Sequence, residues 1–442
     1  MEVILTNSQK EAAEKIDKFL KSDQMYFRLT GPPGSGKTFL IKYALERFLK
    51  EEEDTGKMCV VGITLSHKAK NVLNKASIRH CRTFASAYGY KEVIKDDGSR
   101  VFSPASFLEE KPVGHLPIPI FVHDEISQYS YEMKKIVFSK TSLFSKVILM
   151  GDKAQLPPID STMAIDEDSP MFSFELPDFC QHELNERVRQ KKGNPILDLS
   201  DVIREEIFGS QNMSRVIEEI LKPKLDSENK GHLIIDEKDL YDKYLKSKNF
   251  LENKIIAFRK FKVNIRNNEI RSLLFPKSNQ KIISGDLLFM TNNFVSEDAK
   301  QRLMNSDEFV VVDVRTWDMP GPTGKKIECY VGDVYSDGII KQIITPTEAG
   351  EVEYQKTLER LVSDARQNPK LWPNKFAFEK MFCEFTMGYG INAYKCQGST
   401  YKNVFIDLLD ILETKPLTTK RKLQTIFTAL TRATDVAYFI KP

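Results

Sequence analysis

Three glycines, a lysine and a threonine near the start of the chain are spaced to bind phosphate groups. The stretch "GPPGSGKT" at residues 31–38 matches the pattern G-x-x-x-x-G-K-[ST]. Glycines allow backbone N–H groups to turn toward an anion, and the helix that follows adds its positive N-terminal end. A plain glycine-rich turn is the alternative. The predicted phosphate-binding residues are Gly31, Pro32, Pro33, Gly34, Ser35, Gly36, Lys37 and Thr38.

Two adjacent acids follow an apolar strand downstream of this loop. "IPIFVHDEIS" places Asp124 and Glu125 where the strand ends. Adjacent side chains at a strand end point in different directions, so one can bind a metal while the other deprotonates the attacking water. We therefore predict that Thr38 and Asp124 bind Mg²⁺ and that Glu125 is a general base for hydrolysis. A pair of solvated surface acids is the alternative interpretation.

Polar residues farther along the chain could act on the same phosphates. "ILMGDKAQLPPID" ends another strand and then supplies Gln155, a neutral side chain able to contact a γ-phosphate and a neighbouring domain. Arg187 and Arg189 in "ELNERVRQ" and Arg432 in "FTALTRATD" belong to a later part of the chain. A single arginine is more typical of a surface ion pair. Guanidinium groups from a second domain stabilise transition-state charge when a cleft closes, so we predict a nucleotide site between two domains.

The elements that must position these residues alternate between strand and helix. Helical patterns precede and follow the first strand, and four short apolar runs end where polar or glycine-rich residues begin. This alternation predicts a parallel sheet with crossover helices, whose ligands lie at the carboxyl ends of the strands. The predicted strands are 25–30, 59–65, 118–123 and 146–151.

The alternation is interrupted twice. Between residues 88 and 115, "DDG" flanked by extended runs predicts an inserted β-hairpin. A second α/β unit begins with the strand near residue 255, and short strands with turn residues between 281 and 344 then predict a small β-barrel. A helical stretch follows, and the α/β pattern resumes after residue 383. The second unit is therefore predicted to be discontinuous.

The amino-acid composition excludes fewer classes of protein than the motifs do. A chain of 442 residues with 41% hydrophobic content can form two to four globular units. The balance of 65 Lys plus Arg against 62 Asp plus Glu gives a net charge of +3, which neither requires nor excludes nucleic acid. The six cysteines lack a C-x-x-C pair, as expected of thiols in a reducing compartment. No signal or membrane-spanning pattern is present, so we expect a cytoplasmic protein, in the host cytoplasm if it is phage-encoded.

Taken in order, the motifs resemble those of the superfamily 1 DNA helicases, particularly the RecD-like and Dda-like branch of phage and bacteria. The resemblance covers nearly the whole chain, and "GDKAQLPP" together with "QGST" and "ALTRA" is more specific than the phosphate loop alone. The matching stretches are "TNSQKEA", "GPPGSGKT", "TLSHKAKNVL", "RTFAS", "DEIS", "GDKAQLPP", "ELNERVR", "YKCQGST" and "TALTRA".

The resemblance implies an α/β fold with two RecA-like domains that bind ATP between them. Residues 1–87 and 116–185 would form domain 1A, and residues 186–280 and 383–442 domain 2A. The hairpin 88–115 would be domain 1B, and an SH3-like barrel with a helical extension, 281–382, domain 2B. Gln9 would read the adenine, Gly398 would contact the nucleotide and Gln155 would sense the γ-phosphate. The implied catalytic residues are Lys37, Glu125, Gln155, Arg189 and Arg432, the last two as arginine fingers.

A translocating enzyme must hold a nucleic-acid backbone without reading its sequence, which requires hydroxyls, lysines and stacking rings. Phe102 in the hairpin is the expected wedge at the splitting base pair, with Trp372 as its brace; packing within its own subdomain is the alternative. The basic segment "FRKFKVNIR" at residues 258–266 could follow phosphates. The predicted DNA-binding residues are Ser66, His67, Lys68, Thr83, Phe84, Phe102, Tyr394, Lys395 and Ser399.

The expected function is ATP-driven movement along single-stranded DNA, 5′ to 3′ in this branch, with separation of duplex DNA. We expect a monomer that uses ATP and Mg²⁺ and acts on single-stranded and forked DNA, alongside single-stranded DNA-binding or replication proteins. A translocase that displaces proteins and an RNA helicase share the same motifs. A P-loop kinase or switch ATPase without a nucleic-acid partner is a further alternative.

Overall fold

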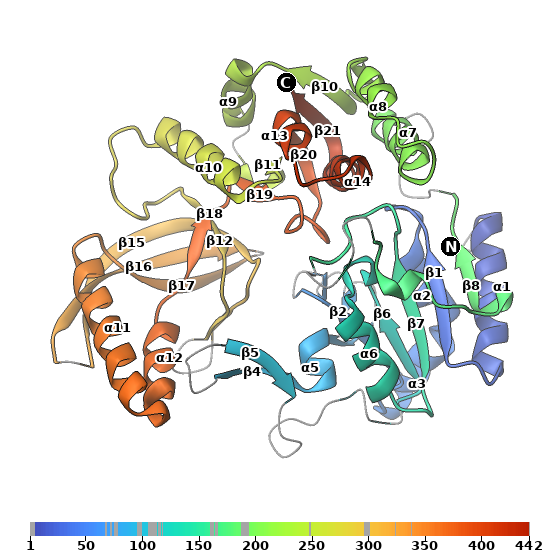
Figure 1. The fold of residues 1–442 in the computed structure, drawn as a ribbon, viewed down its shortest axis with the longest axis horizontal. Helices are drawn as coiled ribbons and strands as arrows, with labels where there is room; N and C mark the ends of the chain where they lie inside the picture. Colours follow the sequence, from blue (N-terminus) through green and yellow to red (C-terminus); the bar gives the residue numbers. More distant parts are fainter. Residues whose placement is uncertain are drawn as a thin grey trace.

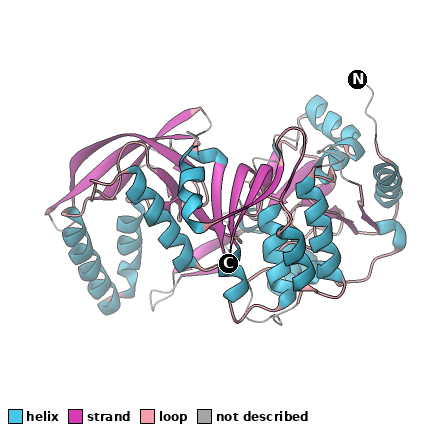
Figure 2. Cartoon of the chain, turned by 90° about the horizontal axis from the view of Figure 1, so that it is seen from above, coloured by secondary structure: helices cyan, strands magenta, loops and turns pink. Residues whose placement is uncertain are grey.

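The structure is a computed structural model in which two parallel α/β units lie beside an antiparallel sheet with two helices (Figure 1). Viewed from above, the antiparallel sheet and its helices form one end of the molecule and the first α/β unit forms the other (Figure 2). Only the backbone of residues 91–94 and 100–104 is described. The described residues are 5–441 without 67–68, 71–72, 75–77, 95–99, 105–112, 114–115, 117, 160–162, 164–166, 187–193, 247–248, 296–300, 323 and 337.

The first unit is built on a six-stranded parallel sheet in the order β3-β2-β6-β7-β1-β8. Strands β2 and β6 are buried along their whole length because hydrophobic clusters cover both faces of the sheet. The strands are β1 Tyr26–Thr30, β2 Val60–Thr64, β3 His80–Thr83, β6 Ile120–His123, β7 Lys146–Gly151 and β8 Gln181–Glu183. The helices are α1 Asn7–Lys21, α2 Lys37–Ala44, α3 Glu46–Thr55, α5 Phe84–Tyr88 and α6 Tyr131–Lys140, with short 3₁₀ turns η2 Ile126–Gln128, η3 Pro170–Phe172 and η4 Asp178–Cys180.

The second unit has a sheet in the order β19-β11-β20-β21-β10-β9, parallel except for β9. Helices α7 and α14 pack together on this sheet in the largest hydrophobic cluster. The strands are β9 Lys224–Leu225, β10 Gly231–Ile235, β11 Asn253–Ala257, β19 Gly390–Asn392, β20 Tyr401–Asp407 and β21 Ala433–Ile440. The helices are α7 Pro195–Phe208, α8 Met213–Ile220, α9 Glu237–Lys246, α10 Lys260–Leu274, α13 Leu408–Glu413 and α14 Thr419–Leu430, with η5 Phe250–Glu252.

Between β11 and β19 the chain forms a five-stranded antiparallel sheet in the order β17-β16-β15-β12-β18. Its edges, β17 and β18, do not pair within the described part of the chain, so the expected small barrel is found as an open sheet. Strand β18 also lies beyond residue 382, where we expected this insert to end. The strands are β12 Leu287–Met290, β15 Glu308–Pro320, β16 Lys326–Ser336, β17 Ile339–Pro346 and β18 Phe385–Met387, with a separate pair β13 Phe294–Val295 and β14 Arg302–Leu303. The helices are α11 Gly350–Gln367 and α12 Trp372–Lys380, with η6 Pro369–Leu371.

A buried ion pair joins this antiparallel sheet to the second unit. Lys254 on β11 is fully buried, and its Nζ lies 3.1 Å from Glu308 Oε2 on β15. Tyr401 on β20 donates its hydroxyl to the other oxygen of Glu308 at 2.8 Å. Buried charges are stable only when paired and hydrogen-bonded, so this contact ties the two sheets together.

The hairpin expected in the first unit is present as β4 Tyr90–Ile94 and β5 Arg100–Pro104, which pair antiparallel. It extends from the first unit on the side of the antiparallel sheet and its helices (Figure 1). Among the described helices, none is long and apolar enough to cross a membrane.

Candidate active site

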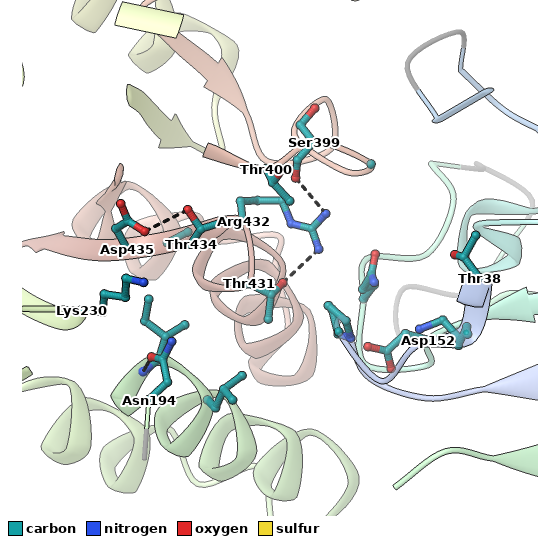
Figure 3. Close-up of a pocket in the computed structure, with 18 of the residues that line it drawn as sticks. Thr38, Asp152, Asn194, Lys230, Ser399, Thr400, Thr431, Arg432, Thr434 and Asp435 are labelled. Carbon is teal, nitrogen blue, oxygen red and sulfur yellow. Dashed lines mark hydrogen bonds between the residues drawn. The ribbon is translucent and has the colours of Figure 1, made fainter. Parts of the chain in front are cut away.

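A cavity of about 840 Å³ lies between the two α/β units, with walls from both. Strands β6, β7 and β1 are neighbours in the first sheet, so the loops at their carboxyl ends meet at this cavity. Figure 3 shows Arg432 projecting from the second unit toward the side of the cavity that carries Thr38 and Asp152. Of the predicted ATP-site residues, the cavity is lined by Pro33, Gly34, Lys37, Thr38, Asp124, Glu125, Gln155, Gly398 and Arg432.

The phosphate loop has the backbone that its glycines predict. Gly34 and Gly36 have φ angles of 81° and 83°, which favour glycine, and α2 starts directly after them. Gly36 precedes α2 without a side-chain cap, so the first N–H groups of the helix remain available to an anion. Gly31 is packed tightly, since a Cβ there would lie 2.7 Å from the carbonyl oxygen of Leu184. The loop is therefore shaped to receive phosphate oxygens.

Lys37 is folded back over this loop. Its Nζ donates to the carbonyl oxygens of Gly31 and Pro32 at 2.7 and 3.0 Å. Burial lowers the pKa of Lys37, although Asp152 and Asp124 favour its charged form. The buried hydroxyl of Ser35 has no hydrogen-bond partner among the described atoms. A lysine held by carbonyls beside an unsatisfied hydroxyl is suited to exchange these contacts for phosphate oxygens.

The two acids after β6 differ in position and environment. The backbone N–H of Asp124 donates to Ile63 at 2.9 Å, and its carboxylate accepts the N–H of Glu125 at 2.8 Å. Glu125 has a φ of 57°, which is uncommon for a residue with a side chain. Burial raises the pKa of Asp124, and burial and then Asp124 raise the pKa of Glu125 to about 7. A carboxyl that titrates near neutral pH suits a general base.

Arg432 enters the cavity from the second unit. Its guanidinium donates to the carbonyl oxygens of Thr428 and Ser399 at 3.1 and 3.3 Å, and to the hydroxyl of Thr431 at 3.1 Å. Within the described part of the chain these acceptors are all neutral, so the positive charge of Arg432 is not cancelled by an ion pair. Its charge lowers the pKa of Glu125, which places both groups in the same electrostatic environment. The arginine can therefore act on a charged group in the cavity.

The loop that carries Gln155 is held between the units. Leu156 donates its N–H to Thr428 on α14 at 3.2 Å, and its carbonyl oxygen accepts from Gln397 at 3.1 Å. Gln424, also on α14, donates to the carbonyl oxygen of Lys153 at 3.3 Å. Movement of the second unit would therefore move this loop relative to the phosphate loop.

The residues present fit a magnesium ion bound together with phosphates. Thr38 and Asp124 offer a hydroxyl and a carboxylate, the hard oxygen donors that Mg²⁺ prefers. Among the described residues, no group of three or more His, Cys, Asp and Glu could hold a metal by itself. Mg²⁺ is usually bound through one or two carboxylates plus substrate phosphates, so this sparse donor set is suitable.

Gln9 is not among the residues that line the cavity, and its expected contact with adenine stays a prediction. It is buried, its Nε2 donates to the carbonyl oxygen of Ser35 at 3.1 Å, and its Oε1 accepts the N–H of Thr6 at 3.2 Å. Thr6 and Gln9 form a capping box at the start of α1. In this arrangement Gln9 supports the phosphate loop from behind, because its amide is engaged by the protein.

Several predicted DNA-binding residues have other roles in the structure. Phe84 is buried in the core, with its ring centroid 4.9 Å from that of Tyr88, so it cannot stack on a base here. Thr83 accepts the N–H of Ser86 as the cap of α5, and the hydroxyl of Ser66 accepts the N–H of Ala69. Ser399 is buried and lines the nucleotide cavity instead of an open surface. Tertiary packing around the motif thus overturns the stacking role of Phe84, whereas DNA contacts of Ser66, Thr83 and Ser399 stay predictions.

Tyr394 and Lys395 lie beside one another after β19. Tyr394 is half-buried with its ring 6.1 Å from that of Phe258, whereas Lys395 is exposed and its Nζ lies 4.9 Å from the ring centroid of Phe289. Both therefore remain candidates for DNA contact. The predicted residues His67, Lys68, Arg187 and Arg189 and the side chain of Phe102 lie outside the described part of the structure.

The basic segment at the start of α10 is largely neutralised. Arg259 is ion-paired with Asp410, and Arg266 is buried with its Nη2 2.9 Å from Asp407. Trp372 is likewise buried within the helical extension, against Phe376. These contacts do not support a role for the start of α10 in binding DNA phosphates. They also do not support Trp372 as a brace for the expected wedge residue Phe102.

Two charged residues at the site have no counterpart among the predicted ones. Asp152 is buried and lines the cavity, and Arg204 on α7 of the second unit forms an ion pair with it. Asp152 lies within the quoted stretch "GDKAQLPP", in which the motif pattern predicts a phosphate contact only for Gln155. Arg204 lies in an ordinary amphipathic helix, and no sequence pattern marks it.

Comparison with known proteins finds one matching family model and two relatives of similar sequence. The family described as "AAA domain" matches residues 4–210. The ATP-dependent DNA helicase dda of Enterobacteria phage T4 is 27% identical over 297 residues, 65% of this chain and 61% of that protein. The alignment thus spans less than two thirds of the phage protein. An uncharacterised protein, R530, of Acanthamoeba polyphaga mimivirus is 22% identical over 98% of this chain and 99% of its own.

Solved structures of similar fold include Pif1 helicases. Pif1 helicase from Bacteroides in complex with ADP-AlF3 and single-stranded DNA matches with a TM-score of 0.52 and 16% identity, over 100% of this chain and 95% of that chain. Pif1 helicase from Candida albicans matches with a TM-score of 0.53 and 13% identity over the same shares. The sequence similarity to the dda helicase confirms the predicted resemblance to the Dda-like helicases, and the solved Pif1 structures show a shared fold.

Proposed function

We propose that this chain, which resembles the Dda and Pif1 helicases, is an ATP-dependent DNA helicase that hydrolyses ATP between its two α/β units. The observation that carries the proposal is the shared cavity. Lys37, Asp124 and Glu125 enter it from the first unit, and Gly398 and Arg432 enter it from the second. A site assembled from both units couples hydrolysis to their relative movement.

Each of these cavity residues would have a separate role in ATP hydrolysis. Lys37 would exchange the carbonyl oxygens of Gly31 and Pro32 for terminal phosphate oxygens. Thr38 and Asp124 would hold Mg²⁺, which when bound neutralises charge on the phosphates. Glu125 accepts the proton of the water that attacks the γ-phosphorus, and the bond to the bridging oxygen breaks to release ADP. Arg432 and, by motif resemblance, Arg189 stabilise the negative charge of the transition state.

The same resemblance supports the finer features of the proposal. The two units would be the RecA-like domains 1A and 2A, with the hairpin as domain 1B and the antiparallel sheet with its helices as domain 2B. Movement would be 5′ to 3′ on single-stranded DNA, with the hairpin separating the strands of a fork. Tyr394 and Lys395 are the described residues that best fit a DNA contact. A cytoplasmic, monomeric enzyme that works beside other replication proteins completes the proposal.

One pair of assays tests this function. ATP hydrolysis is measured with and without single-stranded DNA, and strand separation is measured on duplexes with a 5′ or a 3′ tail. We expect hydrolysis to be stimulated by DNA and unwinding to require ATP and a 5′ tail. Hydrolysis indifferent to DNA would contradict the proposal. Stimulated hydrolysis without unwinding of a fork would instead indicate a translocase, and stimulation by RNA alone would indicate an RNA helicase.

A further inference from the structure

Arg204 of the second unit reaches the edge of the nucleotide site in the first. One arm of its guanidinium is ion-paired with Asp152 Oδ1, and the other lies 2.7 Å from Glu183 Oε1 on β8. The side chains of Arg204 and Asp152 are 14% and 0% exposed, whereas that of Glu183 is 45% exposed. The contact with Asp152 is thus shielded from water, and the contact with Glu183 is open to it.

Asp152 connects this arginine to the phosphate loop. Its Oδ1 also accepts the N–H of Ala154 at 3.1 Å, so it fixes the loop that leads to Gln155. Its Oδ2 is buried and has no hydrogen-bond partner among the described atoms. The carboxylate lines the cavity, and its charge is the main one favouring the charged form of Lys37. An unpaired buried carboxylate oxygen is costly, which indicates that it gains a partner when the site is filled.

The position of Arg204 distinguishes it from other contacts between the units. Lys420 on α14 also crosses between them and lies 2.9 Å from Asp168, but neither residue lines the cavity. Arg204 acts on a residue that does line it. The charges of Arg204 and Arg432 both lower the pKa of Lys37. Two arginines of the second unit therefore act electrostatically on the same lysine of the first.

We propose that Arg204 is a positioning residue of the ATP site, which acts through Asp152. With the units in contact, Arg204 holds the Asp152 carboxylate and the loop to Gln155 in place, and Oδ2 faces the terminal phosphates and their bound cation or water. When the units separate, the ion pair breaks and the loop loses this support. Arg204 thereby links closure of the cleft to the geometry of Lys37 and Gln155. This inference rests on the proposed ATP hydrolysis.

The test compares steady-state ATP hydrolysis, with saturating single-stranded DNA, across matched variants. We expect Arg204→Gln to lower kcat about 10- to 100-fold, with KM for ATP changed less than about 3-fold, because positioning acts mainly on the transition state. Arg204→Lys keeps the positive charge but loses the two-armed guanidinium, so its kcat should lie between those of Arg204→Gln and the wild type. Glu183→Gln and Lys420→Gln are the controls and should stay within about 2-fold of wild type, because neither side chain lines the cavity.

A double-mutant cycle identifies the route of the effect. If Arg204 acts through Asp152, the variant Arg204→Gln/Asp152→Asn should have nearly the same kcat as Asp152→Asn alone. Multiplicative losses in the double variant, or a loss in Lys420→Gln as large as that in Arg204→Gln, would overturn the proposal. Thermal melting checks folding. If Arg204→Gln alone is unfolded, the comparison of the double variant with Asp152→Asn decides the question, since the double variant removes both charges of the pair and Asp152→Asn leaves Arg204 paired with Glu183.

The result for the wild-type protein distinguishes a failure of this inference from a failure of the proposed function. A wild-type chain that hydrolyses no ATP would remove the proposed function and this inference together. DNA-stimulated hydrolysis in the wild type, with Arg204→Gln equal to the controls, would leave the function standing and overturn only the role of Arg204.

Discussion

Gly398 of the second unit lies directly against the carboxyl of Glu125 in the first. A Cβ added to Gly398 would lie 2.7 Å from Glu125 Oε1, well inside contact distance. Gly398 has a φ of 74°, and both residues line the cavity. The general base expected for hydrolysis is therefore positioned partly by the absence of a side chain on the opposite unit.

This contact predicts that Gly398→Ala impairs catalysis specifically. The methyl group should displace Glu125 or hold the units apart, lowering kcat for ATP hydrolysis at least about 10-fold, since small misplacements of a catalytic group are costly. Nucleotide binding, measured by fluorescence titration with a labelled ADP, should change little.

Gly324→Ala is the matched control for that experiment. Gly324 has a similar φ of 81°, but nothing lies within 4 Å of an added Cβ. Both variants carry the backbone strain of roughly 1–2 kcal/mol expected for a left-handed residue. Equal losses of activity in the two variants would show that strain, and not the contact with Glu125, is responsible.

Arg432→Lys should separate catalysis from binding. Arg432 contacts only neutral oxygens in the described structure, so its charge is available to the transition state. We expect kcat to fall about 10²- to 10³-fold, the usual cost of losing a preorganised donor, because Lys keeps the charge but not the planar guanidinium, with little change in melting temperature. Lys37→Met, by contrast, should weaken ATP binding as well. Isothermal titration and steady-state kinetics distinguish the two patterns, and a normal kcat in Arg432→Lys would contradict the assignment.

The hairpin predicts a separation between hydrolysis and unwinding. Phe102 lies on β5, opposite Glu92 of β4. If its ring is the wedge, Phe102→Ala should leave DNA-stimulated ATP hydrolysis nearly unchanged while it slows separation of a forked duplex severalfold, because a lost stacking contact is worth about 1–3 kcal/mol. A parallel loss of both activities would count against the wedge and indicate a packing role.

The buried pair Lys254 and Glu308 predicts a large effect on stability. Lys254→Met leaves the Glu308 carboxylate buried without its cation, so the free energy of unfolding should fall by about 3–5 kcal/mol. Adding Glu308→Gln should restore much of that loss. Lys402→Met removes an exposed partner of Glu252 and serves as the control, with little effect expected. Urea unfolding measures all four proteins, and similar losses for Lys254→Met and Lys402→Met would refute the idea.

His232 predicts a pH dependence of stability. It is buried on β10, its Nε2 donates to the carbonyl oxygen of Lys222 at 2.9 Å, and its Nδ1 has no partner among the described atoms. Burial lowers the pKa of His232 below the usual 6.5, so the unfolded chain binds the proton more readily than the folded one. Stability should therefore decline as the pH falls below about 6.5. Urea unfolding at pH 8 and pH 5.5 should show a smaller decline in His232→Gln, and an identical decline would exclude this histidine as a cause.

The local motifs of the chain were sufficient to predict the core of the site. The glycines at 34 and 36 require a particular backbone, and an apolar strand that ends in Asp124 and Glu125 presents its acids at the sheet edge. The alternation of strands and helices likewise predicted both parallel sheets. These features depend on residues close together in sequence, whose conformational preferences survive in the folded protein.

Tertiary packing decided the rest. It buried Phe84 and engaged Gln9 behind the phosphate loop, although both belong to matched motifs. It placed Ser399 at the nucleotide cavity and brought Arg204 to Asp152 across 52 residues of sequence. Burial of a ring and pairing of distant charges depend on how whole units pack, and no local pattern encodes those distances. The sequence by itself predicted a triphosphate-binding loop; the fold decided which side chains line the cavity beside it.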